Sequence, residues 1–338
     1  MIMARGLARQ FRAKGRRGAA VQAVAGVDIT VAAGELVGFL GPNGAGKTTT
    51  LRMLTTLLVP TAGAATVAGC DLLKDPRGVR RRIGSVAQGF GTSPESSVAE
   101  EMHIQGRLYG LTRSDVRRRA VELAEQLELT ALQRRPARTL SGGQRRRLDL
   151  ALGLIHSPDL LFLDEPTTGL DPQSRANLWD HIRRLRAESG MTLFLTTHYL
   201  DEADALCDRI LVMDQGRIIA EGTPDALKAQ VSGDGVSVGV TADHIAGTAA
   251  IVRRIAGVQD VSTTADLVRF RIPRAHTMLP DLLRALDAAH IPAHSLQVTR
   301  PTLDDVFFIL TGRTLRESER SPSTPSAPDK ETPSDAAA

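Results

Sequence analysis

Short apolar runs alternate with longer segments of helical periodicity from the N-terminus to about Thr223. Runs of four or five apolar residues without polar alternation are typical of parallel strands buried on both faces, and helices then connect them. We therefore expect an α/β fold for this part of the chain. The apolar runs lie at Leu36–Leu40, Asp159–Leu163, Met191–Leu195 and Ile210–Met213.

The pattern changes between Ser97 and Leu140, where Glu, Arg, Leu and Ala dominate and strand-forming residues are scarce. Such a composition favours helices over strands. We expect a helical subdomain at about residues 97–140, inserted into the α/β domain of residues 1–225.

From about Gly233 the alternation of strands and helices begins again. The predicted order is β-α-β-β-α-β, which is typical of the split βαβ, or ferredoxin-like, arrangement. We expect a small α+β domain, ferredoxin-like, at residues 234–312. Its predicted elements are Val236–Val240, Ala246–Ile255, Val258–Val261, Leu267–Ile272, Thr277–Ala289 and Ala293–Val298.

The last periodic segment precedes a tail without apolar periodicity. Leu303, Val306, Phe307 and Leu310 share one face of a predicted helix, because they follow the i, i+3, i+4, i+7 spacing. After Arg313 the chain is rich in Ser, Pro, Glu and Ala, so we expect residues 313–338 to be disordered.

Composition excludes several classes of protein. Hydrophobic residues make up 42% of the 338. The sequence nevertheless contains no uninterrupted stretch of about 18 apolar residues, the length that a membrane-spanning helix needs. The two cysteines, Cys70 and Cys207, are too far apart for a disulfide framework or a cysteine-rich zinc site. Only 3% of residues are aromatic, and the net charge of +4 is spread along the chain, so we expect no nucleic-acid partner.

One glycine-rich loop carries the strongest chemical signal. Residues Gly41 to Thr48 fit the pattern G-x-x-x-x-G-K-[ST], between a predicted strand and a predicted helix at Thr48–Leu58. In loops of this pattern the backbone amides converge on phosphate oxygens, the lysine reaches the β- and γ-phosphates, and the hydroxyl ligates Mg²⁺. The chain has only five lysines, and one of them ends this loop. The candidate nucleotide-binding residues are Gly41, Pro42, Asn43, Gly44, Ala45, Gly46, Lys47, Thr48 and Thr49.

Two acidic residues follow the apolar run that ends at Leu163. A carboxylate at the C-terminal end of a parallel strand projects into the crevice where ligands of open α/β sheets bind. We expect Asp164 to hold Mg²⁺, directly or through water, and Glu165 to orient or deprotonate the attacking water.

A second candidate anion site begins at Ser141. Leu140-Ser141-Gly142-Gly143-Gln144 precedes a predicted helix over Arg145–Leu154, whose N-terminal amides would face an anion. The chain has two such helix starts but one lysine-bearing loop. Two copies that meet head to tail would satisfy both.

The order of these motifs resembles that of the nucleotide-binding subunit of an ABC (ATP-binding cassette) transporter. The residues after the signature, Arg146–Ala151, are similar to those of the daunorubicin/doxorubicin resistance ATPase family of multidrug exporters. So are Asp164–Pro172, Thr197–Ala203 and Pro301–Phe307, and the resemblance covers about residues 4–312.

The resemblance implies roles for further residues. Gly41–Thr48 corresponds to the Walker A loop, and Ser141, Gly142, Gly143 and Gln144 to the signature that closes over ATP bound to the opposite subunit. Gln88 matches the Q-loop glutamine, which touches Mg²⁺ or its water, and Asp164-Glu165 matches the Walker B pair. Asp171 matches the D-loop, and His198 the switch histidine at the γ-phosphate.

Phe11 resembles the aromatic residue that stacks on adenine, and the alternative for it is a core phenylalanine. Here the chain departs from the usual family spacing, because Arg12–Ala20 lengthens the first predicted hairpin with a basic stretch. That stretch is a solvated loop or a contact with lipid head groups.

The leading hypothesis is an ATP hydrolase that dimerises on ATP and Mg²⁺ and drives an exporter. We expect a separate transmembrane permease, a homodimer of this chain, and a peripheral position on the cytoplasmic face of the membrane. The alternative is an ABC ATPase acting on nucleic acid or the ribosome, but such chains carry two cassettes or a long coiled coil. A nucleotide sensor without hydrolysis is a third class, against which Glu165 argues. The cargo, whether drug or another hydrophobic compound, is open.

Overall fold

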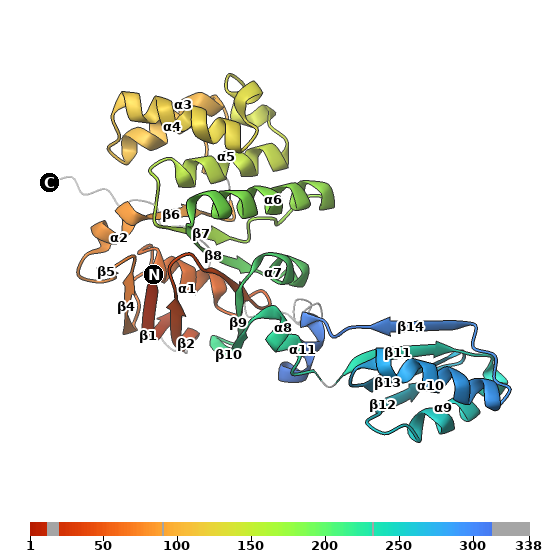
Figure 1. Ribbon diagram of the computed structural model, residues 1–338. Helices are drawn as coiled ribbons and strands as arrows, with labels where there is room; N and C mark the ends of the chain where they lie inside the picture. The colour runs from red at the N-terminus through yellow and green to blue at the C-terminus, as the bar shows by residue number, and fades with distance from the viewer. Residues whose placement is uncertain (12–19, 90, 232, 313–338) are drawn as a thin grey trace.

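The computed structural model describes residues 1–11, 20–89, 91–231 and 233–312. The expected disordered tail at residues 313–338 lies outside the described residues. Three sheets organise the described chain, and two of them form the larger part of the molecule (Figure 1). In the described residues no helix combines the length and the apolar character that crossing a bilayer requires.

The central sheet has six strands in the order β10-β9-β3-β8-β7-β6, all parallel except the pair β9–β10. Every residue of β3, β7 and β8 is buried, as expected for parallel strands covered on both faces. The strands are β3 (Leu36–Leu40), β6 (Ile83–Val86), β7 (Leu160–Asp164), β8 (Thr192–Thr197), β9 (Arg209–Asp214) and β10 (Arg217–Gly222).

An antiparallel sheet lies beside the central one, in the order β2-β1-β4-β5. It buries the alternate apolar residues of its long hairpin in a core shared with Phe39, Phe162 and Phe194 of the central sheet. The strands are β1 (Ile2–Phe11), β2 (Val21–Val31), β4 (Ala62–Val67) and β5 (Cys70–Asp71).

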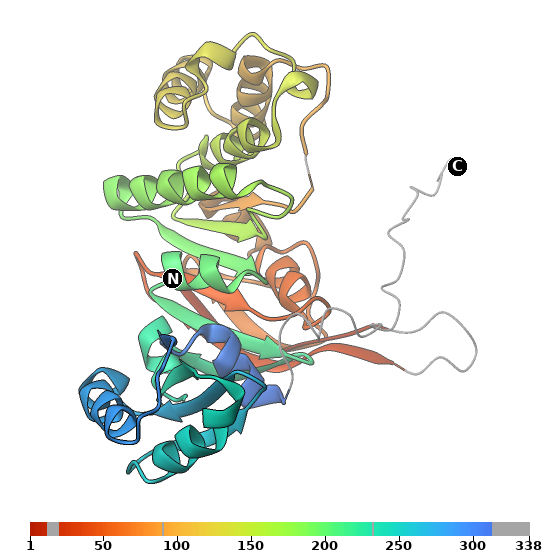
Figure 2. The same ribbon diagram turned by 90° about the vertical axis from the view of Figure 1, so that its right-hand side faces the viewer.

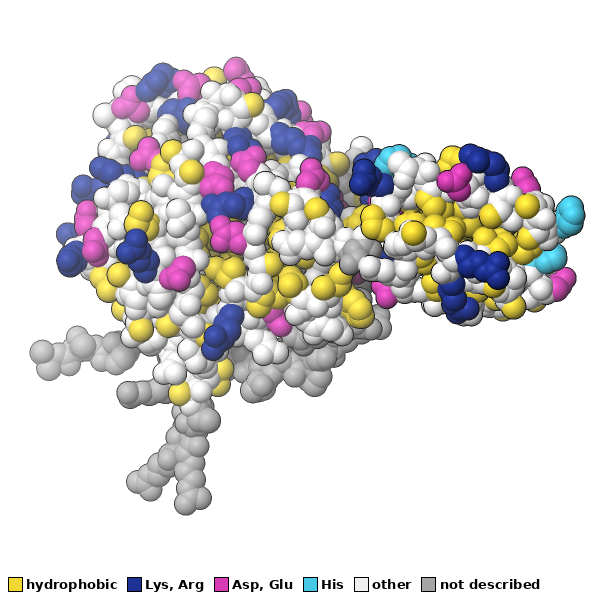
Figure 3. All heavy atoms as spheres, turned by 60° about the horizontal axis from the view of Figure 1, so that its bottom comes forward, with side chains coloured by type: hydrophobic (Ala, Val, Ile, Leu, Met, Phe, Trp, Pro, Cys, Tyr) yellow, Lys and Arg dark blue, Asp and Glu magenta, His cyan; other side chains and the backbone are white. Residues whose placement is uncertain are grey.

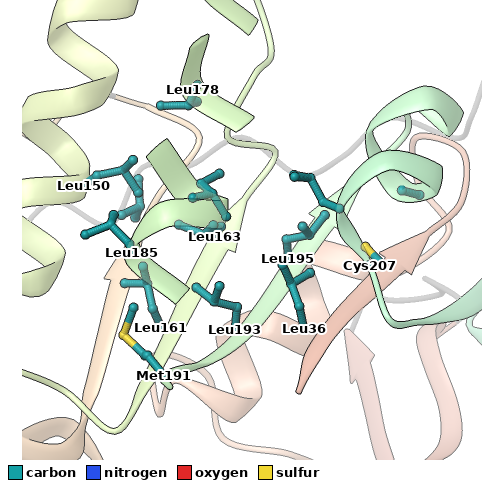
Figure 4. Packing of buried hydrophobic residues seen from close by; sticks show 14 of the residues in the cluster. Leu36, Leu150, Leu161, Leu163, Leu178, Leu185, Met191, Leu193, Leu195 and Cys207 are labelled. Carbon is teal, nitrogen blue, oxygen red and sulfur yellow. The ribbon is translucent and has the colours of Figure 1, made fainter. Parts of the chain in front are cut away.

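Helices cover the central sheet, and the other large core lies beneath them (Figure 4). Leucines from α5, α6, β7 and β8 meet there. The helices of this part are α1 (Lys47–Leu54), α2 (Pro76–Arg82), α5 (Gly142–Leu154), α6 (Pro172–Ser189), α7 (Leu200–Leu206) and α8 (Pro224–Lys228). The prediction that the first helix reaches Leu58 was wrong: the helix ends before Thr56, whose φ of 64° is left-handed.

Residues 97–140 form helices and short 3₁₀ turns, without a strand in this described segment. Each long helix starts at a hydroxyl cap, Ser97 or Thr112, and Ser97 forms a capping box with Glu100. The elements are α3 (Val98–Leu108), α4 (Arg113–Gln126), η1 (Thr130–Leu132) and η2 (Ala137–Thr139). This helical segment lies at one end of the molecule, and the C-terminal module at the other (Figures 1 and 2).

The C-terminal module has an antiparallel sheet in the order β12-β13-β11-β14 with two helices on one face. This order is that of a split βαβ fold, which confirms the ferredoxin-like prediction together with the α/β class of the rest of the chain. The elements are β11 (Asp234–Gly239), η3 (Ala242–His244), α9 (Ile245–Arg253), β12 (Gln259–Thr263), β13 (Leu267–Ile272), α10 (Ala275–Ala288) and β14 (Ser295–Thr299).

The last helix, α11 (Leu303–Thr311), leaves the module and packs on α7 and α8. Leu303, Val306 and Phe307 are buried in the core beneath the central sheet's helices. The predicted fourth member of this face, Leu310, is instead 38% exposed near the end of the helix, which Gly312 caps.

Candidate functional site

The loop between β3 and α1 is built for close backbone approach. Gly41 is packed so tightly that a Cβ added to it would lie 2.2 Å from the carbonyl oxygen of Met213. Gly46 has a left-handed φ of 109°, and a Cβ added to it would lie 2.5 Å from the carbonyl oxygen of Ala23. No other residue type fits either position without a shift of the backbone. The loop therefore keeps its backbone open to close approach directly before the N-terminus of α1, where helix amides favour an anion.

Lys47 begins α1 and is buried, with 4% of its surface exposed. Its ammonium donates hydrogen bonds to the carbonyl oxygens of Gly41, at 2.7 Å, and Pro42, at 3.1 Å. The side chain thus folds back across the loop. Of the remaining loop residues, Asn43 and Gly44 are exposed and Ala45 is buried, while Thr49 is half-buried on the first turn of α1.

Asp164 ends β7, next to the loop. Its Oδ1 accepts hydrogen bonds from Thr48 Oγ1 at 3.2 Å and from Thr196 Oγ1 at 2.6 Å. A carboxylate with adjacent hydroxyls is an oxygen donor set of the kind Mg²⁺ prefers, with phosphate oxygens and water as further ligands. The described residues contain no cluster of three His, Cys, Asp or Glu side chains that could hold a metal ion by themselves.

Four side chains from four segments converge on the carboxylate of Glu165. Its Oε2 lies 3.1 Å from Gln88 Nε2, 3.1 Å from Thr168 Oγ1 and 3.2 Å from His198 Nδ1. Its Oε1 lies 3.5 Å from Lys47 Nζ. The structure therefore brings together the predicted residues Lys47, Gln88, Glu165 and His198.

The electrostatics of Glu165 favour its charged form. Burial raises the pKa of this carboxyl, but the hydrogen bond of His198 and the positive charge of Lys47 outweigh burial and hold the pKa below its ordinary value. Glu165 is therefore ionised at neutral pH and can accept a proton or a hydrogen bond.

The backbone of Glu165 is unusual. Its φ of 47° lies in the left-handed region, which costs a non-glycine residue about 1–3 kcal/mol unless the surroundings impose it. The Glu165 amide donates to the carbonyl oxygen and to Oγ1 of Thr196, both at 3.1 Å. Strand β8 thus fixes the turn that aims the carboxylate.

The structure does not bring the signature into this cluster. Ser141 caps α5, where its Oγ accepts from the Gln144 amide at 3.3 Å and Gln144 Oε1 accepts from the Ser141 amide at 3.0 Å. Gly142 is exposed, and Ser141, Gly143 and Gln144 line a pocket with Gln173, Ser174 and Asn177 of α6. No residue of the loop Gly41–Thr48 lines this pocket.

Asp171 caps the helix that faces the signature. It accepts hydrogen bonds from the amide of Ser174 at 2.9 Å and from its hydroxyl at 2.6 Å. The bonds from Ser174 lower the pKa of the Asp171 carboxyl. Asp171 thereby fixes the start of α6 beside Gly143.

Phe11 ends β1 and is 39% exposed, which excludes the alternative of a core phenylalanine. The guanidinium of Arg9 lies 4.8 Å from the centre of its ring. Its partner across the hairpin is Val21, two residues before Ala23, which touches Gly46 of the loop. The intervening basic stretch at residues 12–19 lies outside the described residues.

Sequence reasoning missed three residues of the site. Thr196 and Thr168 hold the two carboxylates, and Arg146 binds the backbone beside them. Thr196 directly precedes Thr197-His198, so its place at a strand end was an available signal. Threonines and arginines are common on any surface, and only the packing of β7 against β8 distinguishes these three.

The parallel sheet, the glycine-rich loop and the paired carboxylates at a neighbouring strand end define a P-loop nucleotide-binding protein of the ATP-binding cassette class. The family model described as "ABC transporter" matches residues 24–168. The model for the C-terminal domain of "ATP-binding protein DrrA1-3-like" proteins matches residues 222–310.

Proteins similar to the whole chain are ATP-binding subunits. The daunorubicin resistance ATP-binding protein DrrA3 of Streptomyces coeruleorubidus is 45% identical over 298 residues, which is 88% of this chain and 94% of that protein. The linearmycin resistance ATP-binding protein LnrL of Bacillus subtilis is 38% identical and covers 87% of this chain, with 95% of its own length matched.

Solved structures give the same result for the larger part of the chain. An ATP-binding cassette determined as a dimer bound to ADP and Pi matches with a TM-score of 0.60 at 25% identity, over 66% of this chain and 98% of that one. CbiO1 from Clostridium perfringens, part of an ABC transporter complex, matches with a TM-score of 0.61 at 27% identity, over 68% of this chain and 90% of its own.

The chain belongs to the ABC transporter ATP-binding proteins, in the family of the daunorubicin/doxorubicin resistance ATPases. It is the ATP-binding, ATP-hydrolysing subunit of an ABC exporter. These comparisons do not favour the alternative of an ATPase acting on nucleic acid or the ribosome.

Proposed function

We propose that two copies of this chain sandwich two ATP molecules head to tail, so that Ser141–Gln144 of one copy completes the site at Lys47 of the other. One observation carries this proposal. Lys47, Gln88 and His198 converge on Glu165, whereas Ser141 lines a separate pocket against α6. A site that needs both sets of groups therefore takes the second set from another copy.

In this scheme each group of residues at a site has its own role in binding or hydrolysis. The loop amides and Lys47 bind the phosphates, and Phe11 stacks on the adenine ring. Glu165, ionised because of His198 and Lys47, accepts a proton from the attacking water. His198 and Gln88 orient that carboxylate and contact the γ-phosphate and its water.

Thr48, Gln88 and Asp164 would hold Mg²⁺, which when bound neutralises charge on the β- and γ-phosphates. Thr48 Oγ1 and Asp164 Oδ1 lie 3.2 Å apart, and both are oxygen atoms of the kind that ligates Mg²⁺. Asp171 sets the start of α6, where the signature of the same copy packs.

Hydrolysis removes the γ-phosphate contact, and the two copies then separate. We propose that this cycle drives a separate transmembrane permease from the cytoplasmic face of the membrane, with the helical segment at residues 97–140 receiving it. The names of the relatives support a drug or another hydrophobic compound as cargo.

We propose three parts for the chain: the ATP-binding domain at residues 1–225, an accessory α+β domain at 234–312, whose last helix α11 packs back on the ATP-binding domain, and the tail at 313–338. The accessory domain would regulate or support the dimer. Hydrophobic side chains gather on the face of this module that Figure 3 presents. An apolar face of this kind is a candidate contact surface.

Mixing two inactive variants tests the head-to-tail arrangement. Lys47→Ala removes the phosphate lysine but keeps the signature, and Gly143→Asp places a carboxylate in the signature but keeps the loop. In a mixed dimer one site combines an intact loop with an intact signature, so ATPase activity returns on mixing. A mixture as inactive as its components would contradict the shared site, and a double variant carrying both changes is the matched control.

A further inference from the structure

Arg146 is a buried cation that the proposed cycle does not use. It lies on α5, five residues after Ser141, and is 3% exposed. Its Nε donates to the carbonyl oxygen of Pro166 at 2.6 Å, its Nη1 to that of Ala87 at 2.7 Å, and its Nη2 to that of Glu165 at 3.0 Å.

Backbone carbonyl groups provide the close contacts of this guanidinium. Its carboxylate partner, Asp149, lies farther away, with 3.5 Å between Asp149 Oδ2 and Nη1. A planar guanidinium offers its N–H groups in a fixed fork, so several carbonyls bound at once are held in one geometry. Arg146 therefore fixes backbone positions and does more than balance a charge.

The carbonyls belong to the two segments that carry catalytic candidates. The paired register of β6 and β7 ends at Val86 and Leu163, and beyond it the chain continues to Ala87 and Glu165. Arg146 bridges the two segments just past the point where sheet hydrogen bonding stops. Gln88 follows Ala87, and its Nε2 donates to Glu165 Oε2 at 3.1 Å.

The bridge formed by Arg146 contacts Glu165 where its backbone is in the left-handed region. Thr196 binds its amide from one side, and Arg146 binds its carbonyl from the other. A non-glycine residue remains in this conformation only when its surroundings impose it, and these two contacts do so.

We propose that Arg146 is a positioning residue for ATP hydrolysis: its guanidinium holds the backbone of Glu165, and of Ala87 directly before Gln88, in register with the signature helix α5. The proposal rests on the proposed function, in which Glu165 acts on water and Ser141 on the second copy's ATP. A single rigid helix then connects the signature to the catalytic carboxylate of its own copy, and a shift of α5 moves both.

The test compares Arg146→Lys with wild type in the full chain. Lysine keeps the charge but lacks the fork that reaches Pro166, Ala87 and Glu165 together. We expect kcat to fall by about 10- to 100-fold, the size of effect that a misplacement of about 1 Å produces, with ATP affinity by calorimetric titration unchanged. Arg119→Lys is the matched control, because Arg119 binds the carbonyl of Leu154 at the far end of α5, and its kcat should equal that of wild type.

A second measurement separates positioning from a general structural role. If Arg146 acts through Glu165, Arg146→Lys should change the residual single-turnover rate of Glu165→Gln by no more than about twofold, because the two changes affect one step. If Arg146→Lys does not fold, Arg146→Gln, which keeps an amide donor, takes its place.

Three outcomes would overturn the assignment. The first is a kcat for Arg146→Lys equal to that of wild type. The second is a loss of about 10- to 100-fold in the single-turnover rate when Arg146→Lys is added to Glu165→Gln, as large as the loss expected in wild type. The third is failure of both Arg146 variants to fold, which would make the guanidinium a requirement of the fold alone. The proposed function fails separately, if wild type hydrolyses no ATP or if Glu165→Gln hydrolyses it normally.

Discussion

Gln88 donates a hydrogen bond to Glu165 over 3.1 Å, although 77 positions separate the two residues in the chain. The contact arises because β6 and β7 are parallel neighbours whose C-terminal ends meet at one edge of the sheet. The catalytic candidate of one strand is therefore oriented by a residue that follows the next strand, and hydrolysis should depend on both.

Glu165→Gln should abolish steady-state ATPase activity while ATP binding persists. The amide is nearly isosteric but cannot accept a proton, and positioned proton transfer contributes about 10²- to 10⁴-fold to rate. Because ATP is bound but not consumed, the dimer should accumulate, which size-exclusion chromatography with ATP measures. Glu188→Gln, on the exposed end of α6, is the control, and an ATPase rate for Glu165→Gln within about tenfold of wild type would remove the base assignment.

Lys47→Ala should lose ATP affinity. The ammonium is held at the loop by the carbonyls of Gly41 and Pro42, so it lies where the β- and γ-phosphates would bind. A titration calorimeter measures the affinity directly. Lys74→Ala, at an exposed position, should bind ATP like wild type; equal affinities for the two variants would contradict the phosphate role of Lys47.

Thr196→Val should impair both stability and hydrolysis. The change keeps the shape of the side chain but removes the hydroxyl that donates to Asp164 and accepts from the Glu165 amide. A buried group that loses its partner costs about 1–3 kcal/mol, measured by urea unfolding.

Thr192→Val provides the comparison on the same strand. Its hydroxyl accepts from the Gly34 amide at the opposite end of β8, so its loss should lower stability and leave kcat unchanged. A kcat for Thr196→Val as high as that of Thr192→Val would show that the hydroxyl does not serve the site.

Asp149→Asn should raise stability more at neutral than at acidic pH. Burial raises the pKa of Asp149 from 3.8 to about 6, against the opposing charges of Arg146 and Arg145. Well below pH 3.8 the carboxyl is protonated in both the folded and the unfolded chain. Between pH 4 and 6 only the unfolded chain releases the proton, so the free energy of unfolding of wild type falls as pH rises, by about 3 kcal/mol at most.

Asparagine cannot ionise, so the free energy of unfolding of Asp149→Asn does not fall with rising pH through this group. The difference in unfolding free energy between Asp149→Asn and wild type should therefore grow from pH 4.5 to pH 7 in urea titrations. Asp180→Asn, an exposed change on α6, gives the baseline for the loss of one carboxylate. A difference that stays constant with pH would contradict the ionisation argument.

Phe307→Ala should destabilise the ATP-binding part of the chain. Its ring is fully buried where α11 packs on α7 and α8, and the loss of a buried phenylalanine costs about 3–5 kcal/mol. The neighbouring Phe308 is 49% exposed, so Phe308→Ala should have little effect on unfolding by urea. Equal effects of the two changes would mean that α11 does not stabilise this core.

The sequence by itself determined the elements and the chemistry that depends on local order. Fully apolar runs such as Leu36–Leu40 are typical of buried parallel strands, and the strand β3 has those same bounds. The glycines and Lys47 of the loop act through their own backbone and side chain, so their spacing alone indicates a phosphate site. The order of strands and helices after Gly233 likewise sufficed for the split βαβ arrangement.

Only the tertiary structure decided which residues meet. Thr196 and Arg146 are ordinary in the sequence, and they matter because β8 lies beside β7 and because α5 crosses the ends of β6 and β7. The final helix was predicted from its periodicity. No local pattern predicts that the chain returns to the ATP-binding part and that this helix packs on α7 and α8. Contacts between residues far apart in the chain depend on how strands are ordered and helices docked, and burial of the shared core sets that order.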